Sequence, residues 1–250
     1  MAARPVLALV SLLLLAGGIV MQFLVILSGA VRGSPENQIY FLQSTTRGIP
    51  NARNPTRWAF FALTGVDDNR LNSNYGSTVP ALPFDPPRNF GTQSGIPTSF
   101  LGTHYYYYLS RFMFAFYLIA LFFAVIAFLT GLLALCTRLG AYLSSLNTAL
   151  AFFFQALAAS LMTAWTVKGR NRFRSAGQDS HLGVKAHAFT WAAFACFFLA
   201  TITFCLGGSS GRREKRNKNG LGRKGSRRSR NSARGSFTGS ERAGVKEEYV

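Results

Sequence analysis

Charge is scarce in this sequence, and acidic charge is the scarcest. Only 9 of the 250 residues are Asp or Glu, against 27 Lys and Arg, and charged residues make up 14% of the chain. A soluble domain usually carries about 25% charged residues. This deficit, together with a hydrophobic fraction of 49%, argues against a soluble globular protein. Cysteine is rare as well, and three cysteines cannot build the disulfide framework of a small secreted scaffold.

The sequence also lacks the short motifs that carry catalysis or bind metals. It contains no HExxH, no CxxC pair and no Walker-type phosphate loop, and its histidines number three: His104, His181 and His187. The pair Asp67-Asp68 has no histidine near it and is interpreted as a turn element. We therefore predict no catalytic, cofactor-binding or metal site, and a protein that is not an enzyme.

Four long apolar intervals are present instead. A transmembrane helix needs about 20 predominantly apolar residues, and each interval can hold one. The predicted spans are 6–28, 112–136, 142–166 and 187–207. The alternative of four buried soluble helices conflicts with the missing charged faces. We predict an all-α membrane domain over 1–207, a four-transmembrane-helix bundle.

The first interval has a second interpretation. Arg4, the apolar run after it and the small residues Ser28-Gly29-Ala30 resemble a cleavable signal peptide. The apolar core of a signal peptide runs about 7–15 residues, and Val6 to Leu27 is longer. An uncleaved span is the favoured interpretation.

The basic residues of the C-terminal tail set the predicted topology. Residues 208–250 hold 13 Lys and Arg and four Glu, and positive charge beside a span favours the cytoplasm. With four spans, both termini are then cytoplasmic, and the loops 29–111 and 168–185 lie outside. One observation opposes this: the short outer loop is also basic, with Lys168, Arg170, Arg172, Arg174 and Lys185.

The long outer loop differs in composition from the spans. Residues 33–110 hold eight of the nine prolines, which exclude a long helix or a central strand there. Aromatic and aliphatic residues at 38–43 and 57–63 indicate short β elements. The loop is therefore predicted to be partly β, and it contains no cysteine.

Four sequence blocks carry a family resemblance: ILSG at 26–29, IYFLQSTTRGIPNA at 39–52, TRWAFFALTG at 56–65 and TVPALPFDPPRNF at 78–90. With four spans and a long first outer loop, the chain resembles the fungal Sur-seven/PalI family of claudin-like, tetraspan plasma-membrane proteins. The resemblance implies a non-enzymatic role in stable membrane furrows (eisosomes) and in cell-cortex and cell-wall integrity. The PalI branch implies an alternative, a sensor or trafficking accessory in ambient-pH signalling. The family usually has two loop cysteines, expected near Thr64 and Tyr75, and both are absent here.

Candidate structural residues follow from the loop blocks and from the spans. The candidates for a compact loop cap are Trp58, Pro80, Asn89 and Phe90. Small residues let membrane helices approach closely, and they recur at every fourth position of the fourth span: Ala188, Ala192, Cys196 and Ala200. Such stripes fit packing within the bundle, and they fit contact with other copies equally well. Gln155, in the third span, is predicted to hydrogen-bond a neighbouring helix. The second span has a similar row at Ala120, Ala124, Ala127 and Gly131.

Aromatic and cysteine residues near the span ends suggest interfacial roles. Tyr105 to Tyr108, Trp165 and Trp191 fit an aromatic belt at the outer interface. Cys136 and Cys205, near the inner ends of two spans, are candidates for S-palmitoylation or plain apolar core residues.

The tail is predicted to be disordered because it is rich in Gly, Ser, Asn, Arg and Lys. Its attachment to a span makes anionic inner-leaflet lipid the expected partner, with nucleic acid as the disfavoured alternative. The first residues expected to contact lipid are Arg212, Arg213, Lys215 and Arg216. Phosphorylation would add about −1.5 to −2 charge each at Ser226, Ser229, Ser232 and Ser236, and would release the tail from the membrane.

These observations predict a structural tetraspan protein that self-associates, or joins other cortical membrane proteins, to stabilise a plasma-membrane domain. A pH-signalling accessory and a small transporter or channel are the alternatives.

Overall fold

The computed structural model describes the backbone of residues 3–134 and 138–228, and side chains within 6–133 and 140–207. The chain divides into two compact units, Met1–Gly208 and Ser209–Val250. The membrane domain predicted over 1–207 corresponds to the first unit, and the contacts described below lie within it.

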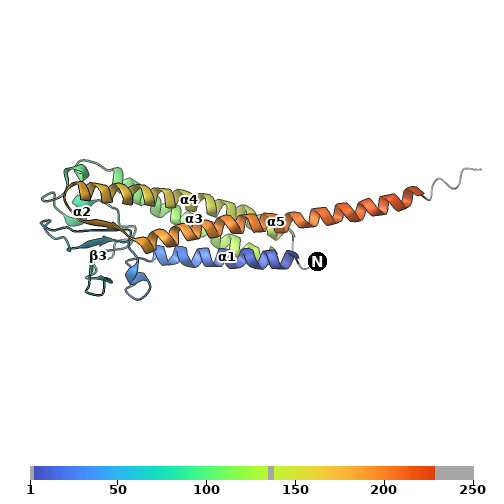
Figure 1. The fold of residues 1–250 in the computed structure, drawn as a ribbon, viewed down its shortest axis with the longest axis horizontal. Coiled ribbons are helices and arrows are strands. Elements are labelled where there is room, and N and C mark those ends of the chain that lie inside the picture. The colour runs from blue at the N-terminus through green and yellow to red at the C-terminus, as the bar shows by residue number, and fades with distance from the viewer. Residues whose placement is uncertain (1–2, 135–137, 229–250) are drawn as a thin grey trace, which may run out of the picture. The chain divides into compact units, whose positions relative to one another are not determined.

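Four long helices form the body of the first unit: α1 (Ala3–Ile26), α3 (Tyr105–Ala134), α4 (Arg138–Ser175) and α5 (Val184–Arg228). They run alongside one another, with a small sheet at one end (Figure 1). Within the described residues, four segments are long and apolar enough to cross a membrane: Val6–Ile26, Tyr105–Leu133, Gly140–Ser175 and Val184–Gly207. The four-span prediction is confirmed.

Two helices extend well beyond their predicted spans at the sheet end, and α5 begins at Val184 rather than at 187. α3 begins at Tyr105 rather than at 112, and α4 continues to Ser175 rather than ending at 166. The predicted outer loops, 29–111 and 168–185, are correspondingly shorter. Hydropathy marks where apolar residues stop, but both helices continue because Tyr106 and Phe173 are buried in the core beyond that point.

Each of the four helices has a row of buried residues with the same spacing, in steps of four and three residues in alternation. In α1 these are Ser11, Leu15, Gly18, Gln22 and Val25. In α3 they are Tyr106, Ser110, Met113, Tyr117, Ala120, Ala124, Ala127 and Gly131. In α4 they are Ser144, Thr148, Ala151, Gln155, Ala158, Met162, Trp165 and Gly169, and in α5 Ala186, Thr190, Ala193, Phe197, Ala200 and Phe204. A period of 3.5 residues is typical of helices that pack in a left-handed bundle.

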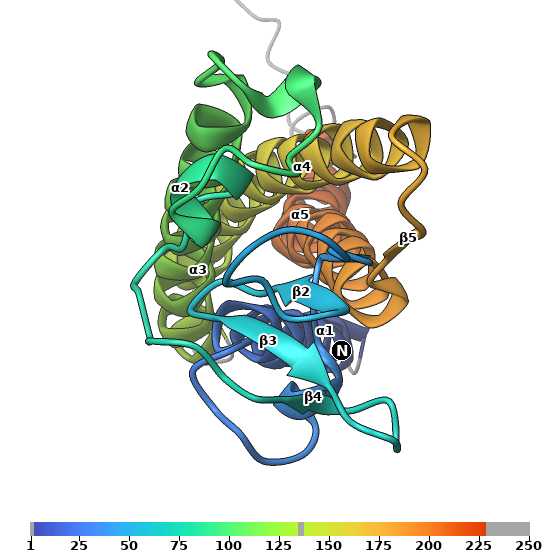
Figure 2. The ribbon, with the colours of Figure 1, turned by 90° about the vertical axis from the view of Figure 1, so that its left-hand side faces the viewer.

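The sheet has five antiparallel strands in the order β4-β3-β2-β1-β5. Four come from the first outer loop: β1 (Leu42–Ser44), β2 (Thr56–Trp58), β3 (Leu63–Val66) and β4 (Asn72–Ser73). The fifth, β5 (Ser180–Leu182), lies between α4 and α5 and pairs with β1, with Gln43 opposite His181. The end-on view shows the sheet beside the helix ends (Figure 2). The two outer loops therefore fold as one body, the outer cap, which we define as residues 27–104 and 176–183.

Short elements complete the outer cap: the 3₁₀ turns η1 (Glu36–Gln38) and η2 (Thr98–Phe100) and the helix α2 (Pro86–Phe90). Proline suits the first position of a helix, where its missing N–H is not needed, and Pro86 begins α2. Gly91 ends it with a φ of 65°, a left-handed conformation that glycine adopts without strain. The proline-rich segment thus forms one short helix, in agreement with the exclusion of a long one.

One hydrophobic core joins the outer cap to the helices. It includes Phe41, Trp58 and Phe84 from the cap, and Tyr117 and Trp165 from α3 and α4. A second, smaller core of alanines, leucines and phenylalanines lies further along the bundle, where Leu15 of α1 meets Ala127 of α3 and Phe197 of α5.

The N-terminal end of α1 and the end of the fourth span lie at the same end of the bundle. A Cβ atom placed on Gly207 would be 3.9 Å from the Cβ of Leu7. Backbone helix is described as far as Arg228, but residues 229–250 and the side chains beyond Gly207 lie outside the described residues. The disordered tail predicted over 208–250 stays a prediction.

Candidate functional site

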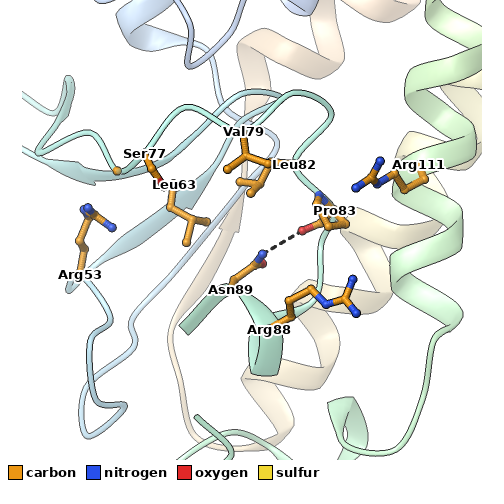
Figure 3. A pocket seen from close by; sticks show the side chains of 10 residues that line it. Arg53, Leu63, Ser77, Val79, Leu82, Pro83, Arg88, Asn89 and Arg111 are labelled. Carbon is orange, nitrogen blue, oxygen red and sulfur yellow. Dashed lines mark hydrogen bonds between the residues drawn. The ribbon is translucent and has the colours of Figure 1, made fainter. Parts of the chain in front are cut away.

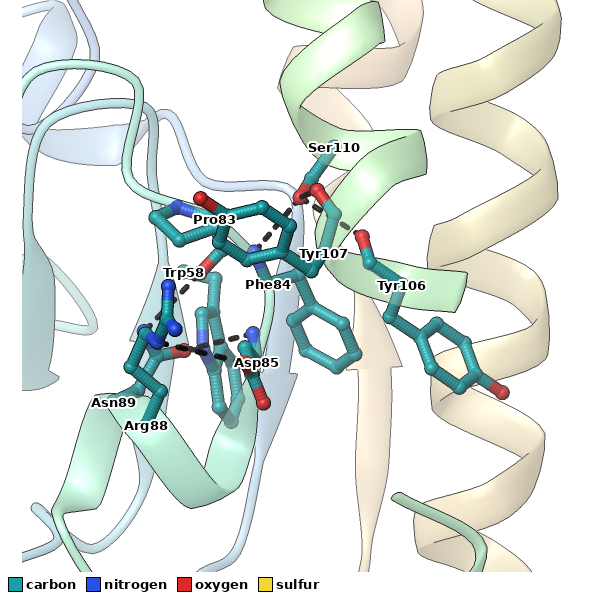
Figure 4. A network of polar contacts seen from close by, with 9 residues as sticks. All are labelled: Trp58, Pro83, Phe84, Asp85, Arg88, Asn89, Tyr106, Tyr107 and Ser110. Carbon is teal, nitrogen blue, oxygen red and sulfur yellow. Dashed lines mark hydrogen bonds and ion pairs between the residues drawn. The ribbon is translucent and has the colours of Figure 1, made fainter. Parts of the chain in front are cut away.

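Trp58 and Asn89, two of the predicted loop-cap residues, meet in the interior of the outer cap. The indole Nε1 of Trp58 donates a hydrogen bond to Oδ1 of Asn89 at 3.0 Å. The Asn89 side chain also accepts from the backbone N–H of Asp85 and donates to the carbonyl of Pro83 (Figure 4). A single amide therefore ties β2 to α2 and to the loop before it.

Phe90 belongs to the same cluster, and Pro80 does not. The rings of Phe90 and Trp58 lie 5.9 Å apart, and both side chains are buried. Pro80 is exposed in the turn that follows β4. The sequence alone did not show whether Pro80 lies in a surface turn or in the interior of the cap.

Phe84 is the central aromatic residue of the outer cap, and the sequence analysis did not single it out. Its ring contacts those of Trp58, Phe100, Tyr106, Trp165 and Phe173, at centroid distances of 4.8 to 6.3 Å. Its backbone N–H donates to the hydroxyl of Ser110 in α3 at 2.9 Å. The sequence feature that could have indicated a buried role for Phe84 is its place among prolines in the segment LPFDPP.

Arg57, in β2, is buried although it carries a charge. Its side chain donates to Oε1 of Gln43, to Oδ1 of Asn72 and to the carbonyl of Arg70, and it lies 4.1 Å from the ring centre of Tyr40. Burial lowers the pKa of the Arg57 guanidinium below its usual value, while Tyr40 and Asp67 oppose the shift. A buried charged group is tolerated when its N–H donors form hydrogen bonds. Through these bonds, Arg57 links β2 to β1 and to β4.

The basic residues of the second outer loop make contacts at the outer-cap end of the molecule. Nζ of Lys168 donates to the Tyr105 hydroxyl at 2.7 Å, and Nε of Arg174 donates to the carbonyl of Ser180 at 2.9 Å. Lys185 contacts the side chain of Gln38. These contacts give three of the five positive charges of 168–185 a structural role.

A chain of hydrogen bonds links all four helices inside the bundle. Nε2 of Gln22 in α1 donates to the carbonyl of Tyr117 in α3 at 2.9 Å, and to Oε1 of Gln155 in α4 at 3.0 Å. Nε2 of Gln155 donates to the carbonyl of Thr190 in α5 at 3.1 Å. Gln155 is fully buried, so its amide joins neighbouring helices, as a buried polar group in a membrane requires.

The predicted small-residue stripe of α5 does not coincide with the buried face. Ala188 is exposed, Ala192 and Cys196 are half-buried, and of the four only Ala200 lies in the core. The row in α3, from Ala120 to Gly131, is buried throughout. The α3 row has the four-three-four spacing of the bundle, whereas a strict step of four drifts around the helix.

The aromatic residues at the outer end divide into two groups. Tyr105, Tyr108 and Trp191 are 41%, 56% and 44% exposed, as residues of an interfacial belt should be. Trp165 is buried, and its indole N–H points to the sulfur of Met113 at 3.2 Å. The assignment of Trp165 to the belt was wrong, because the helix continues past it into the outer cap. Tyr106 was also assigned wrongly, because its side chain is buried in the core.

Several other predicted sites fall outside the described residues. These are Cys136, Ser229, Ser232 and Ser236, and the side chains of Arg212, Arg213, Lys215, Arg216 and Ser226. Cys205 is described: it is exposed, and its Sγ lies 2.9 Å from the hydroxyl of Ser145.

Within the described part of the chain, no three His, Cys, Asp or Glu side chains come together as a metal site would require. His181 and Asp179 form an exposed pair, 3.0 Å apart.

Comparison with known proteins adds to this geometry. A family model described as SUR7/PalI matches residues 7–203. The chain is 38% identical over 199 residues to Protein SUR7 of Candida albicans, a match that covers 79% of the chain and 72% of that protein. It is 41% identical over 188 residues to SUR7 family protein FMP45 of Saccharomyces cerevisiae, covering 74% of the chain and 60% of that protein. A protein of S. cerevisiae that is described as an uncharacterized plasma membrane protein is 32% identical over 200 residues, covering 78% and 65%. For the latter two, the match spans less than two thirds of the relative.

Proposed function

The chain belongs to the SUR7/PalI family, and we propose that it is a non-enzymatic structural protein that stabilises a domain of the plasma membrane. The domain is an eisosome-like furrow, and its stability supports the integrity of the cell cortex and cell wall. The relative described as a plasma membrane protein supports the proposed location in the plasma membrane. The geometry of the bundle and the outer cap supports the proposed mechanism.

The continuous core between the outer cap and the helices carries the proposal. Phe60 of the cap contacts Tyr117 of α3 at 5.3 Å between ring centres, and Phe41 contacts Trp165 of α4 at 6.0 Å. Ring contacts of this kind add about 0.5–1.5 kcal/mol each beyond the area they bury. A cap fused to its helices in this way moves with them as one body, which suits a scaffold better than a transporter that must open and close.

Lateral association uses the lipid-facing surfaces of the helices. On α5 this surface includes Ala188, Trp191 and Phe198, which face away from the bundle core. In lipid, helices associate through close packing rather than through the hydrophobic effect. Copies of the chain, or other cortical membrane proteins, pack against these surfaces.

The basic tail adds contact with the inner leaflet. Both termini are cytoplasmic in this proposal, and Arg212, Arg213, Lys215 and Arg216 contact anionic lipid at about 1 kcal/mol per close charge. Phosphorylation of the serines from Ser226 to Ser236 weakens this contact.

Fluorescence recovery after photobleaching tests the proposal in live cells. We expect the tagged full-length chain to form cortical patches that recover slowly. A variant with glutamine at the four basic positions from Arg212 to Arg216 should recover faster. A uniform distribution that recovers as fast as an unrelated plasma-membrane protein would exclude the proposed role.

A further inference from the structure

A pocket of about 370 Å³ lies in the outer cap beside the start of α3. Three arginines line it: Arg53 before β2, Arg88 in α2 and Arg111 in α3. Arg88 and Arg111 lie on one side and Arg53 on the other, with Leu63 and Val79 between them (Figure 3). The pocket therefore combines cationic walls with an apolar floor.

The positive charge of this pocket is largely uncompensated. None of its lining residues is acidic. Arg88 has one weak ion pair, 3.9 Å from Asp85, with its side chain 62% exposed. Among the described residues, the Arg111 side chain donates no hydrogen bond, and Arg53 donates to the carbonyl of Asn74. The N–H groups of Arg88 and Arg111 are thus available to a ligand.

The guanidinium groups of Arg88 and Arg111 both lie close to the ring of Tyr107. The guanidinium carbon of Arg88 lies 4.9 Å from the ring centre, and that of Arg111 lies 5.4 Å from it. A guanidinium near an aromatic ring keeps its N–H groups free for paired hydrogen bonds to an anion. Two like charges on one ring repel each other, and an anion between them would offset this repulsion.

The walls of the pocket are connected by hydrogen bonds. Asn89 donates to the carbonyl of Pro83, and Phe84 donates to Ser110, the neighbour of Arg111 (Figure 4). The helix that carries Arg88 and the helix that carries Arg111 are therefore joined through one short loop. Such preorganisation lowers the entropy that a ligand must overcome on binding.

The pocket lies close to residues that fit the outer interfacial belt. Tyr105 and Tyr108 are exposed, as at a membrane interface, and Arg111 is one helical turn further along α3. Arginine binds phosphate through paired N–H donors, and its guanidinium geometry matches the phosphate oxygens. We propose that this pocket binds a phosphate group, supplied either by a phospholipid headgroup or by soluble phosphate.

Binding measurements on the full-length chain, purified in an uncharged detergent, test the site. One arm titrates inorganic phosphate and follows thermal stability. The other transfers the chain to phosphatidylcholine nanodiscs, with or without phosphatidic acid, and counts retained lipid by native mass spectrometry. Saturation by phosphate identifies a soluble ligand, and retention of phosphatidic acid identifies a headgroup; either result supports the site.

The double substitution Arg88→Gln/Arg111→Gln should weaken binding of the active probe by about tenfold or more, because it removes the charged donors that would hydrogen-bond the phosphate. The control Arg47→Gln/Arg170→Gln removes two positive charges outside the pocket and should leave binding unchanged. Arg88→Lys/Arg111→Lys keeps both charges and should bind more weakly than the wild type, because lysine lacks the paired donors.

Circular dichroism and elution volume verify the fold of each variant, and the lysine pair tests the site even if the glutamine pair misfolds. The proposal is overturned if neither probe saturates. It is also overturned if the control pair loses as much binding as the pocket pair.

Discussion

Two adjacent glycines in α1 show how single residues set the helix packing. A Cβ atom on Gly18 would lie 2.5 Å from the Phe197 ring and 3.3 Å from the Cβ of Cys196 in α5. A Cβ atom on Gly17 would meet nothing within 4 Å. Both residues are helical, so only the first is needed for close approach of α1 to α5.

Substitution of the two glycines separates packing from helix propensity. Gly18→Val should destabilise the bundle by about 1–3 kcal/mol, because the added side chain overpacks the contact with Phe197. Gly17→Val makes the same chemical change one position away and should be close to neutral. Unfolding in mixed detergent, with both variants measured beside the wild type, checks this. Equal effects of the two substitutions would contradict the packing assigned to Gly18.

At the scale of elements, the period of the buried positions determines which small residues lie at contacts between helices. The row of α3 with four-three-four spacing is buried, whereas the four-step stripe of α5 leaves Ala188 exposed. Between straight helices the contact line would drift, but supercoiled helices keep a line of 3.5-residue period in contact. The face of α5 that lies inside the bundle therefore passes through Ala193, not through Ala188.

Two alanine substitutions in α5 test this register. Ala193→Leu should cost about 1–3 kcal/mol, since Ala193 is fully buried and three more carbon atoms have no space. Ala188→Leu, on the exposed face, should leave stability unchanged. Thermal unfolding in detergent measures both. A larger loss for Ala188→Leu would restore the four-step stripe as the interior face.

At the scale of the molecule, the outer cap and the bundle form one folded body within Met1–Gly208. The second outer loop adds β5 to a sheet built from the first loop, and Phe173 of the extended α4 contacts Trp58 of β2 at 5.6 Å. Segments more than a hundred residues apart in sequence thus complete one core. The absence of loop cysteines is compatible with this arrangement, because the β3–β4 hairpin is paired through Gly65 and Ser73 without a disulfide.

Removal of the central aromatic ring should loosen the outer cap and the outer ends of the helices together. Phe84→Ala deletes a buried ring and should cost about 3–5 kcal/mol. Phe153→Ala deletes a ring that is 54% exposed on α4 and should cost far less. Hydrogen exchange should show faster exchange in β1, in β2 and in α4 near Trp165 for the first variant only. Faster exchange confined to the loop around residue 84 would mean that the cap and the bundle fold separately.

Local composition was sufficient to predict the four spans and to exclude a long helix from the proline-rich outer loop. The family was recognised differently, from the resemblance of four sequence blocks between residues 26 and 90. Apolar length and proline content act over adjacent residues, so they can be recognised without knowing the fold. The sequence placed Trp58 and Asn89 in the same loop cap but did not predict the hydrogen bond between them. It predicted that Gln155 bonds a neighbouring helix but did not identify the partner.

The tertiary structure alone decided which residues meet. β5 is three residues long, too short for an alternating pattern to mark it, and it exists because β1 offers it a partner. Arg57 is buried because acceptors from two separate segments, one at Gln43 and one at residues 70–72, surround it. The interior faces of the helices depend on how the four helices pack against one another. Arg88 and Arg111 line one pocket, and the hydrogen bond from Phe84 to Ser110 ties α3 to the loop before α2. Contacts between distant segments determine these features, and such contacts form only when the chain folds.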